Sequence, residues 1–144
     1  MKTLLAVKNI SKTRPIRVLL AEDEHIYQSI IEKYIHDFDM QLTIVDDGQK
    51  CLDTLEKQHY DVILMDIIMP KINGLEVAQA IRKKGITTPI IAVTSNIWKE
   101  DEEQSRQSGM NDFLPKPFNA QKLAQKIAFW SKKRAPQKRW YPST

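Results

Sequence analysis

Asp66 is the first residue whose position in this chain suggests chemistry. The four apolar residues 62–65 run into it without a break, and Pro70, Asn73 and Gly74 then turn the chain. This pattern predicts a strand that is buried on both faces and has a carboxylate at its carboxyl end. Ligands bind at the carboxyl edge of the strands in an open parallel sheet. Asp66 is therefore a candidate reactive group.

Other polar residues lie in the same way at the ends of predicted strands: Glu22 and Asp23 after residues 16–21, Thr94 after 89–93, and Lys116 after 112–114. If the strands are parallel, these residues converge with Asp66. Neighbouring carboxylates repel each other unless a cation lies among them, and hard oxygen ligands suit Mg²⁺. A carboxylate nucleophile, a metal ion, one lysine and one hydroxyl group would supply the charge neutralisation and alignment that phosphoryl transfer needs.

Five strands alternating with five helices would position these side chains. Short apolar runs predict strands over residues 16–21, 41–45, 62–65, 89–93 and 112–114. Apolar residues at helical spacing predict helices over residues 25–38, 46–55, 75–81 and 123–130, and the apolar stripe of the first of these runs from Ile26 to Phe38. A strongly polar helix, with acids near its amino end, is predicted over residues 97–108. Gly85 is expected to end the third helix through a left-handed cap. Such alternation predicts an α/β domain with a parallel sheet, right-handed crossovers and helices on both faces.

Length and composition favour one domain in a reducing compartment. The chain has 144 residues, of which 42% are hydrophobic, enough for a single real core. The lone Cys51 excludes an intramolecular disulfide and a cysteine-rich metal site, which suits the cytoplasm. No stretch approaches the length of about 20 apolar residues that a membrane span needs.

Charge divides the chain into three segments. The basic N-terminal extension 1–15 and the basic C-terminal tail 131–144 hold nine of the 22 Lys and Arg residues and none of the 18 acids. The domain predicted between them, 16–130, is therefore acidic although the whole chain has a net charge of +4. Basic ends can contact nucleic acid, anionic lipid or an acidic partner, or they can simply be solvated.

The chain resembles a receiver domain of the two-component response-regulator family over about residues 16–130. The resemblance rests on four motifs in family-like order and spacing: Glu22-Asp23, Met-Asp-Ile-Ile-Met-Pro at 65–70 followed by Asn73-Gly74, Ala-Val-Thr at 92–94, and Phe-Leu-Pro-Lys-Pro-Phe at 113–118. It implies a flavodoxin-like receiver fold, which is a doubly wound five-stranded parallel sheet in the order 2-1-3-4-5 with five helices.

The resemblance also implies a role for each site residue. Asp66 would be the phosphoacceptor, taking a phosphoryl group from the phosphohistidine of a histidine kinase or a histidine phosphotransfer protein. Lys116 would pair with a phosphoryl oxygen, with a cis peptide to Pro117. Thr94 would bond the phosphoryl group through its hydroxyl. The chain would then assist its own phosphorylation and dephosphorylation without being an enzyme that acts on a separate substrate.

The implied cofactor is Mg²⁺, which Mn²⁺ could replace. Its ligands would be Asp23, Asp66 and the backbone carbonyl of Ile68, with Glu22 acting mainly through metal-bound water. Ile68 and Asn96 would border the path of water to the acyl phosphate. Because Ile68 offers no side-chain hydrogen bond to position that water, we predict a phosphoryl group that persists for minutes or longer.

The resemblance further implies a switch. Thr94 and the aromatic Phe113 would move on phosphorylation, which would change the surface of the fourth helix, fifth strand and fifth helix. That surface would contact a downstream protein or form a phosphorylation-dependent dimer. We regard this as a population shift between two states.

Several functions remain as alternatives to a stand-alone regulator. A phosphorelay intermediate would pass the group on to a histidine phosphotransfer protein, and a hybrid histidine kinase would carry the receiver as one part; Met1 and the self-contained tails weigh against the latter. A haloacid-dehalogenase-type phosphatase needs a second aspartate where Ile68 stands. The presence of Asp23, Asp66, Thr94 and Lys116 disfavours a binding-only pseudo-receiver. The 14 residues after Trp130 are too few for a DNA-binding helix-turn-helix domain.

Overall fold

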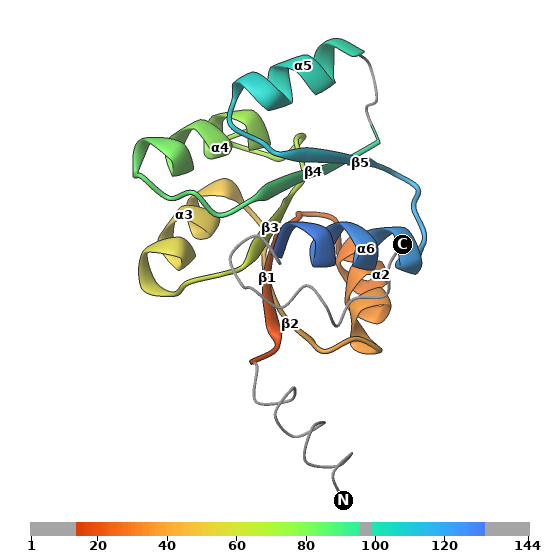
Figure 1. Ribbon diagram of the computed structural model, residues 1–144. Helices are drawn as coiled ribbons and strands as arrows, with labels where there is room; N and C mark the ends of the chain where they lie inside the picture. The colour runs from red at the N-terminus through yellow and green to blue at the C-terminus, as the bar shows by residue number, and fades with distance from the viewer. Residues whose placement is uncertain (1–13, 96–98, 132–144) are drawn as a thin grey trace, which may run out of the picture.

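The computed structural model describes residues 14–95 and 99–131, in which five strands alternate with five helices (Figure 1). The strands are β1 (Ile16–Ala21), β2 (Met40–Val45), β3 (Val62–Met65), β4 (Ile90–Thr94) and β5 (Asp112–Pro115). The helices are α2 (His25–His36), α3 (Gly48–Lys57), α4 (Gly74–Lys83), α5 (Lys99–Gln107) and α6 (Ala120–Ser131). The predicted alternation of elements is confirmed.

The strands form one sheet in the order β2-β1-β3-β4-β5, and every neighbouring pair is parallel. This is the doubly wound, flavodoxin-like order that the family resemblance implied. The strand order reverses its direction next to β1, so β1 and β3 border a topological switch point. In sheets of this kind that crevice is where ligands bind.

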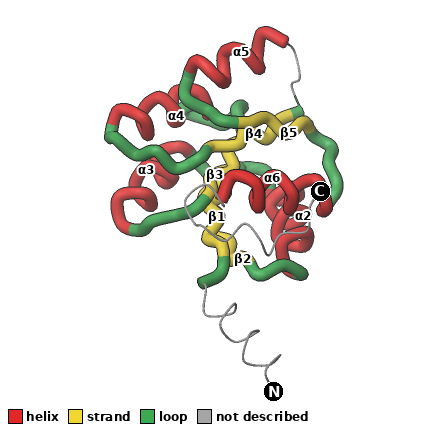
Figure 2. Tube along the Cα trace, viewed as in Figure 1, coloured by secondary structure: helices red, strands yellow, loops and turns green. Residues whose placement is uncertain are grey.

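Helices cover both faces of the sheet (Figure 2). Side chains of successive strand residues point to opposite faces, and β1 shows the result. Leu19 and Ala21 pack in the core cluster that includes residues of α3 and α4, whereas Val18 and Leu20 pack in the cluster that includes residues of α2 and α6. All four side chains are fully buried. The uninterrupted apolar runs in the sequence therefore reflect burial on both faces.

Local hydrogen bonds fix the helix ends near the site. The Asp47 side chain caps α3 by accepting from the Lys50 backbone N–H at 2.8 Å. Asn73 begins α4 with a reciprocal capping box to Glu76. Gly85 follows α4 with a φ of 82°, so the predicted left-handed cap is confirmed.

Two apolar residues assigned to the helical stripe of residues 25–38 do not lie in the core. Ile26 is 73% exposed, because it lies about 140° around the helix axis from the buried Ile31. Phe38 is 41% exposed and lies beyond the end of α2 at His36. Ile31 and Ile35, which belong to the same predicted stripe, are buried and pack in the core as expected.

Two side-chain groups hold the β5 side of the sheet together. Asp112 accepts from Lys126 at 2.9 Å and from the Trp130 indole N–H at 2.8 Å, which joins β5 to α6. Burial raises the pKa of Asp112, but these hydrogen bonds outweigh it and leave the pKa below its usual value. Arg82 of α4 donates to the Gly109 carbonyl at 3.0 Å and to the Asn111 side chain at 2.8 Å, just before β5 begins.

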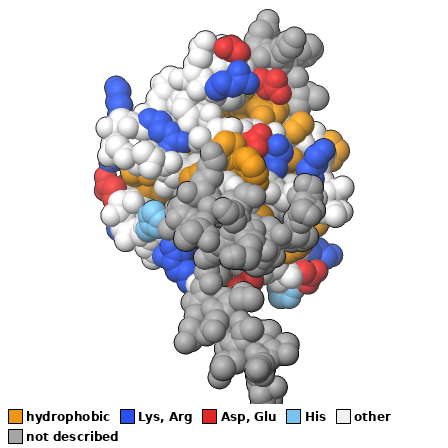
Figure 3. Space-filling model, in the orientation of Figure 1, with side chains coloured by type: hydrophobic (Ala, Val, Ile, Leu, Met, Phe, Trp, Pro, Cys, Tyr) orange, Lys and Arg blue, Asp and Glu red, His pale blue; other side chains and the backbone are white. Residues whose placement is uncertain are grey.

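The coloured surface in Figure 3 shows Lys and Arg side chains dispersed among acidic and uncharged ones. The basic ends predicted from the sequence fall almost entirely on residues 1–13 and 132–144, which lie outside the described residues. Asn96, a predicted tuning residue, also lies outside them. Among the helices that the structure describes, none combines the length and apolar character needed to span a bilayer.

Candidate functional site

Two acids come together because β1 and β3 are neighbours. The last residues of the two strands, Ala21 and Met65, are register partners. Glu22 and Asp66 directly follow them, and the Asp66 N–H donates to the Ala21 carbonyl at 3.0 Å. The two carboxylates therefore leave the sheet edge side by side, as the sequence predicted.

The lysine reaches the same edge from β5. Thr94 and Pro115 are register partners at the ends of β4 and β5, and Lys116 follows directly. The Lys116 N–H donates to the Thr94 carbonyl at 2.9 Å, which fixes the backbone of the lysine to the strand that carries the threonine. The Lys116–Pro117 peptide is cis, as predicted.

Glu22, Asp23 and Asp66 form an acidic cluster. One carboxylate oxygen from each lies within 4.8 Å of the other two. Glu22 is fully buried, Asp66 is 6% exposed, and Asp23 is partly exposed. Buried like charges at this separation repel each other, and carboxylate oxygens are the ligands that Mg²⁺ and Mn²⁺ prefer. The donor set therefore fits a divalent cation.

Lys116 supplies a positive charge to this cluster. Its Nζ lies 3.0 Å from Glu22 Oε1 and 3.7 Å from Asp66 Oδ2, and its side chain is only 8% exposed. Glu22 was expected to act through metal-bound water, and the structure adds a direct contact with the lysine. Its other oxygen, Oε2, accepts from the Glu24 N–H at 3.1 Å. Glu22 therefore also positions Lys116.

The electrostatic environment perturbs Asp66. Burial and the nearby negative charge of Glu22 raise its pKa to about 7, while the positive charge of Lys116 opposes the increase. The Ile68 N–H donates to Asp66 Oδ1 at 3.2 Å and also favours the ionised form. The charge of Lys116 alone therefore does not neutralise the negative charge of the acids, and a divalent cation bound among them would reduce the remaining repulsion.

We expect this imbalance to appear in the pH dependence of stability. The pKa of Asp66 is about 7 in the folded state and about 4 in the unfolded state. Between these values the folded protein binds more protons, so the contribution of Asp66 to the free energy of unfolding falls as pH rises through this window. Asp66→Asn should therefore be more stable than wild type by about 1–3 kcal/mol at about pH 8, and by less at about pH 5.

The measurement is urea unfolding of both proteins across this pH range in a chelator. A difference in unfolding free energy that stays constant between the two pH values would contradict the expected charge repulsion. Adding Mg²⁺ at the higher pH should stabilise wild type more than Asp66→Asn, because a ligand that binds the folded state stabilises it.

The remaining predicted site residues lie around this centre. Thr94 is 1% exposed and is placed beside Lys116 by the backbone bond described above. Ile68 follows Asp66 by two residues and is 60% exposed, so its side chain lies at the open side of the site. Phe113 is half-buried and packs against the core cluster on the α3 and α4 face. Its role as a switch, like the tuning roles of Ile68 and Asn96, stays a prediction.

Two contacts near the site were not predicted from the sequence. The ring of Tyr27 faces Lys116, with the Nζ atom 4.0 Å from the ring centroid. No spacing in the sequence predicts this contact, because Tyr27 in the first turn of α2 and Lys116 after β5 lie far apart along the chain. Gly74 approaches the Asp66 backbone so closely that a Cβ atom would lie 2.2 Å from the Asp66 carbonyl oxygen. Only the turn at Gly74 was predicted, not this contact.

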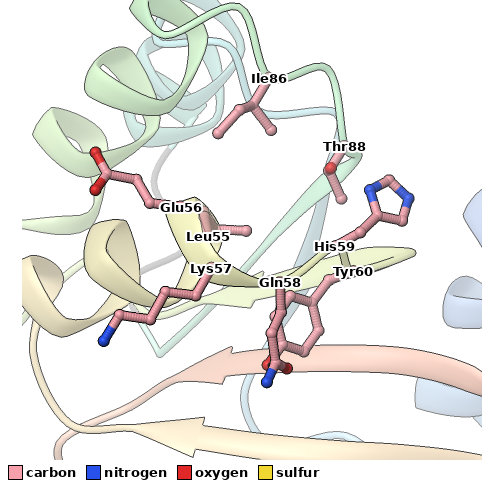
Figure 4. A pocket seen from close by; sticks show the side chains of 8 residues that line it. All are labelled: Leu55, Glu56, Lys57, Gln58, His59, Tyr60, Ile86 and Thr88. Atoms are coloured by element: carbon pink, nitrogen blue, oxygen red, sulfur yellow. The ribbon is translucent and has the colours of Figure 1, made fainter.

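A shallow hollow of about 220 Å³ lies at the opposite edge of the sheet, near the amino ends of β3 and β4 (Figure 4). Its lining includes Tyr60 before β3, and Ile86 and Thr88 before β4. None of the predicted site residues lines it. The candidate site is therefore the acidic cluster at the carboxyl edge, not this hollow.

A 2-1-3-4-5 parallel sheet with buried acids and a lysine at its carboxyl edge defines an α/β protein of the flavodoxin-like class. Within that class, the chain belongs to the response regulator receiver domain family, whose model matches residues 18–128. It is thus a receiver domain of the kind found in two-component systems.

Curated relatives are much longer than this chain. It is 35% identical over 127 residues to transcription factor SKN7 of Saccharomyces cerevisiae, covering 88% of this chain and 20% of that protein. It is 38% identical over 126 residues to hybrid signal transduction histidine kinase I of Dictyostelium discoideum, covering 81% of this chain and 7% of that protein. The chain therefore spans a fifth or less of the length of these relatives.

Solved receiver domains match most of the chain. The receiver domain of sensor histidine kinase PA1611 from Pseudomonas aeruginosa PAO1 is 36% identical with a TM-score of 0.76, covering 81% of this chain and 98% of that one. Its structure has a magnesium ion coordinated in the active site cleft. The receiver domain of Francisella response regulator 1452 is 28% identical with a TM-score of 0.78, covering 83% of this chain and 98% of that one.

Proposed function

We propose that this chain acts as a stand-alone response regulator that accepts a phosphoryl group on Asp66 and signals by protein contact. The observation that carries the proposal is the buried Asp66 carboxylate, grouped with two other acids and facing Lys116 at 3.7 Å. The donor would be a histidine kinase or a histidine phosphotransfer protein, since these are the partners of receiver domains. A cytoplasmic location, which the reduced Cys51 suits, is part of the proposal.

The reaction is a transfer between two protein side chains. A carboxylate oxygen of Asp66 attacks the phosphorus of a phosphohistidine, the P–N bond breaks, and the departing imidazole takes a proton from solvent. The product is an acyl phosphate on Asp66. Lys116 would follow the negative charge from the carboxylate to a phosphoryl oxygen, and Thr94 would hydrogen-bond another oxygen.

The acidic cluster would hold a divalent cation. Asp23, Asp66 and the backbone carbonyl of Ile68 would bind Mg²⁺, or Mn²⁺ in its place, with Glu22 acting through water. The bound ion would neutralise charge on the acids and on the phosphoryl oxygens. Support comes from the three convergent carboxylates of this chain and from the magnesium ion in the related receiver domain of PA1611.

Phosphorylation would change the surface formed by α5, β5 and α6. Thr94 and Phe113 would shift when the hydroxyl of Thr94 bonds the phosphoryl group, and the new surface would bind a downstream protein or a second copy of the chain. The chain assists its own phosphorylation and dephosphorylation, and is not an enzyme acting on a separate substrate.

The test is incubation with phosphoramidate and Mg²⁺, followed by intact mass measurement. We expect a gain of one phosphoryl group that is lost when a chelator replaces Mg²⁺. After removal of the donor, the gain should persist for minutes or longer, because Ile68 cannot position the attacking water. Absence of any gain would leave only the fold and family assignments. Loss within seconds would show that Ile68 does not protect the acyl phosphate.

A relay or hybrid-kinase role is the second candidate, because relatives include a hybrid histidine kinase and the similar PA1611 domain comes from a sensor histidine kinase. A relay intermediate would have to dock histidine-bearing helices twice, once to receive the group and once to pass it on. Mixing the phosphorylated chain with candidate histidine phosphotransfer proteins separates the roles. Rapid transfer to a histidine would favour the relay.

A further inference from the structure

Lys116 has a third neighbour besides the two carboxylates. The ring of Tyr27, in the first turn of α2, lies with its centroid 4.0 Å from the Lys116 Nζ atom. A lysine side chain has a flexible four-carbon stem and a compact charge. A contact at the ammonium group itself therefore restrains the part of the side chain that is farthest from the backbone.

We propose that Tyr27 is a positioning residue for Lys116, and that its ring holds the ammonium group over the acidic cluster, ready to meet a phosphoryl oxygen. This inference rests on the proposed function of Asp66. It gives a role in the reaction to a residue outside the sequence motifs that identified the family.

An aromatic ring suits this task because it is neutral. A cation over a ring face is attracted by the electron density of the ring, and the attraction is stronger where water is excluded. Lys116 is only 8% exposed, so its contact with Tyr27 is largely desolvated. During transfer the lysine must exchange Glu22 and Asp66 for a phosphoryl oxygen. The ring can keep the ammonium in place while these charged partners change.

The ring is itself held by a row of aromatic side chains. Phe118 lies two residues after Lys116, and its ring centroid is 6.1 Å from that of Tyr27. On its other side, Phe118 contacts Tyr34 at a centroid distance of 6.1 Å. Tyr27 and Tyr34 are seven residues apart and therefore share one face of α2. The loop that carries Lys116 is thus fastened to α2 at both Tyr27 and Tyr34.

The chain offers a matched control. Tyr34→Leu removes a ring of the same size from the same row and the same helix, but leaves the ring that faces Lys116. Tyr27→Leu removes the facing ring. If Tyr27 serves only packing, the two substitutions should affect phosphorylation alike once their thermal stabilities are taken into account.

The decisive test varies the electron density of the ring and keeps its shape. Phenylalanine and phenylalanines with one, two or three fluorine atoms are incorporated at position 27, and phosphoryl uptake from phosphoramidate with Mg²⁺ is timed by intact mass. Tyr27→Phe should retain the wild-type rate. Successive fluorination should slow uptake stepwise, reaching roughly 3- to 30-fold for the trifluorinated ring, and Tyr27→Leu should slow it by a similar factor.

A rate that does not change with fluorination, or an equal loss in Tyr34→Leu, would overturn the proposal. Nuclear magnetic resonance separates this outcome from a failure of the proposed function. In the wild type, the ring should displace the proton shifts of the Lys116 side-chain terminus, and Tyr27→Leu but not Tyr34→Leu should return them toward free lysine. If the wild type takes up no phosphoryl group, the proposed function fails. If the proton shifts of the Lys116 side-chain terminus are the same in Tyr27→Leu as in the wild type, the positioning contact itself is refuted.

Discussion

Asp66→Asn should lower phosphoryl uptake from phosphoramidate by on the order of a thousandfold or more, to background. Asparagine has nearly the shape of aspartate, and its carbonyl oxygen can still accept the hydrogen bond that the Ile68 N–H donates at 3.2 Å. It lacks the negative charge and the nucleophilic oxygen that would form the acyl phosphate. The substitution also removes buried charge repulsion with Glu22, so the variant should remain folded.

Asp53→Asn is the control for this loss. Asp53 is an exposed residue of α3 whose side chain accepts from Gln49 on the same helix, away from the strand ends. The control makes the same chemical change and should retain wild-type uptake, measured by intact mass over a time course. Uptake in Asp66→Asn at the wild-type rate would mean that another group accepts the phosphoryl group.

Gly74→Ala should produce the largest loss of stability among conservative changes near the site. A Cβ atom there would lie 2.2 Å from the Asp66 carbonyl oxygen and 2.9 Å from the Ile67 Cα atom. Both are backbone atoms, and the Gly74 N–H also donates to the Ile67 carbonyl at 2.7 Å, so the clash cannot be relieved by a side-chain rotation. We expect the free energy of unfolding to fall by about 2–4 kcal/mol.

Gly74→Ala should also slow phosphoryl uptake, because relieving the clash would displace the backbone segment that carries Asp66. Gly85→Ala is the comparison. A Cβ atom at Gly85 meets nothing within 4 Å, but its φ of 82° disfavours alanine, so this variant should lose only about 1 kcal/mol and retain uptake. Urea unfolding measures both stability changes. Equal losses in the two variants would show that the loop after β3 accommodates the extra methyl group.

The convergence of the site could be predicted because it depends on topology more than on side-chain detail. Asp66 and Glu22 directly follow apolar runs, Lys116 comes shortly after the short strand predicted over residues 112–114, and parallel strands bring such positions to one edge. The strands could be recognised in the sequence because a strand that is buried on both faces consists of consecutive apolar residues, without alternating polar ones. The strand order and the cis Lys116–Pro117 peptide, in contrast, were inferred from the family resemblance.

Contacts within the site could not be predicted in this way. The distances from Lys116 to Glu22 and to the Tyr27 ring depend on the paths of long side chains that no spacing rule fixes. The close approach of Gly74 to Asp66 depends on how α4 meets the end of β3. Periodicity alone also placed Ile26 on the buried face of α2, whereas in the structure that residue is 73% exposed.

The most direct measurement locates the phosphoryl group within the chain. The phosphorylated protein is treated with borohydride, which reduces the acyl phosphate of an aspartate to homoserine, and is then mapped by peptide mass spectrometry. We expect homoserine at position 66, with Asp23 and Glu22 unmodified. Homoserine at another position, or a phosphoryl group found on a histidine with position 66 unchanged, would contradict the assignment of Asp66 as the phosphoacceptor.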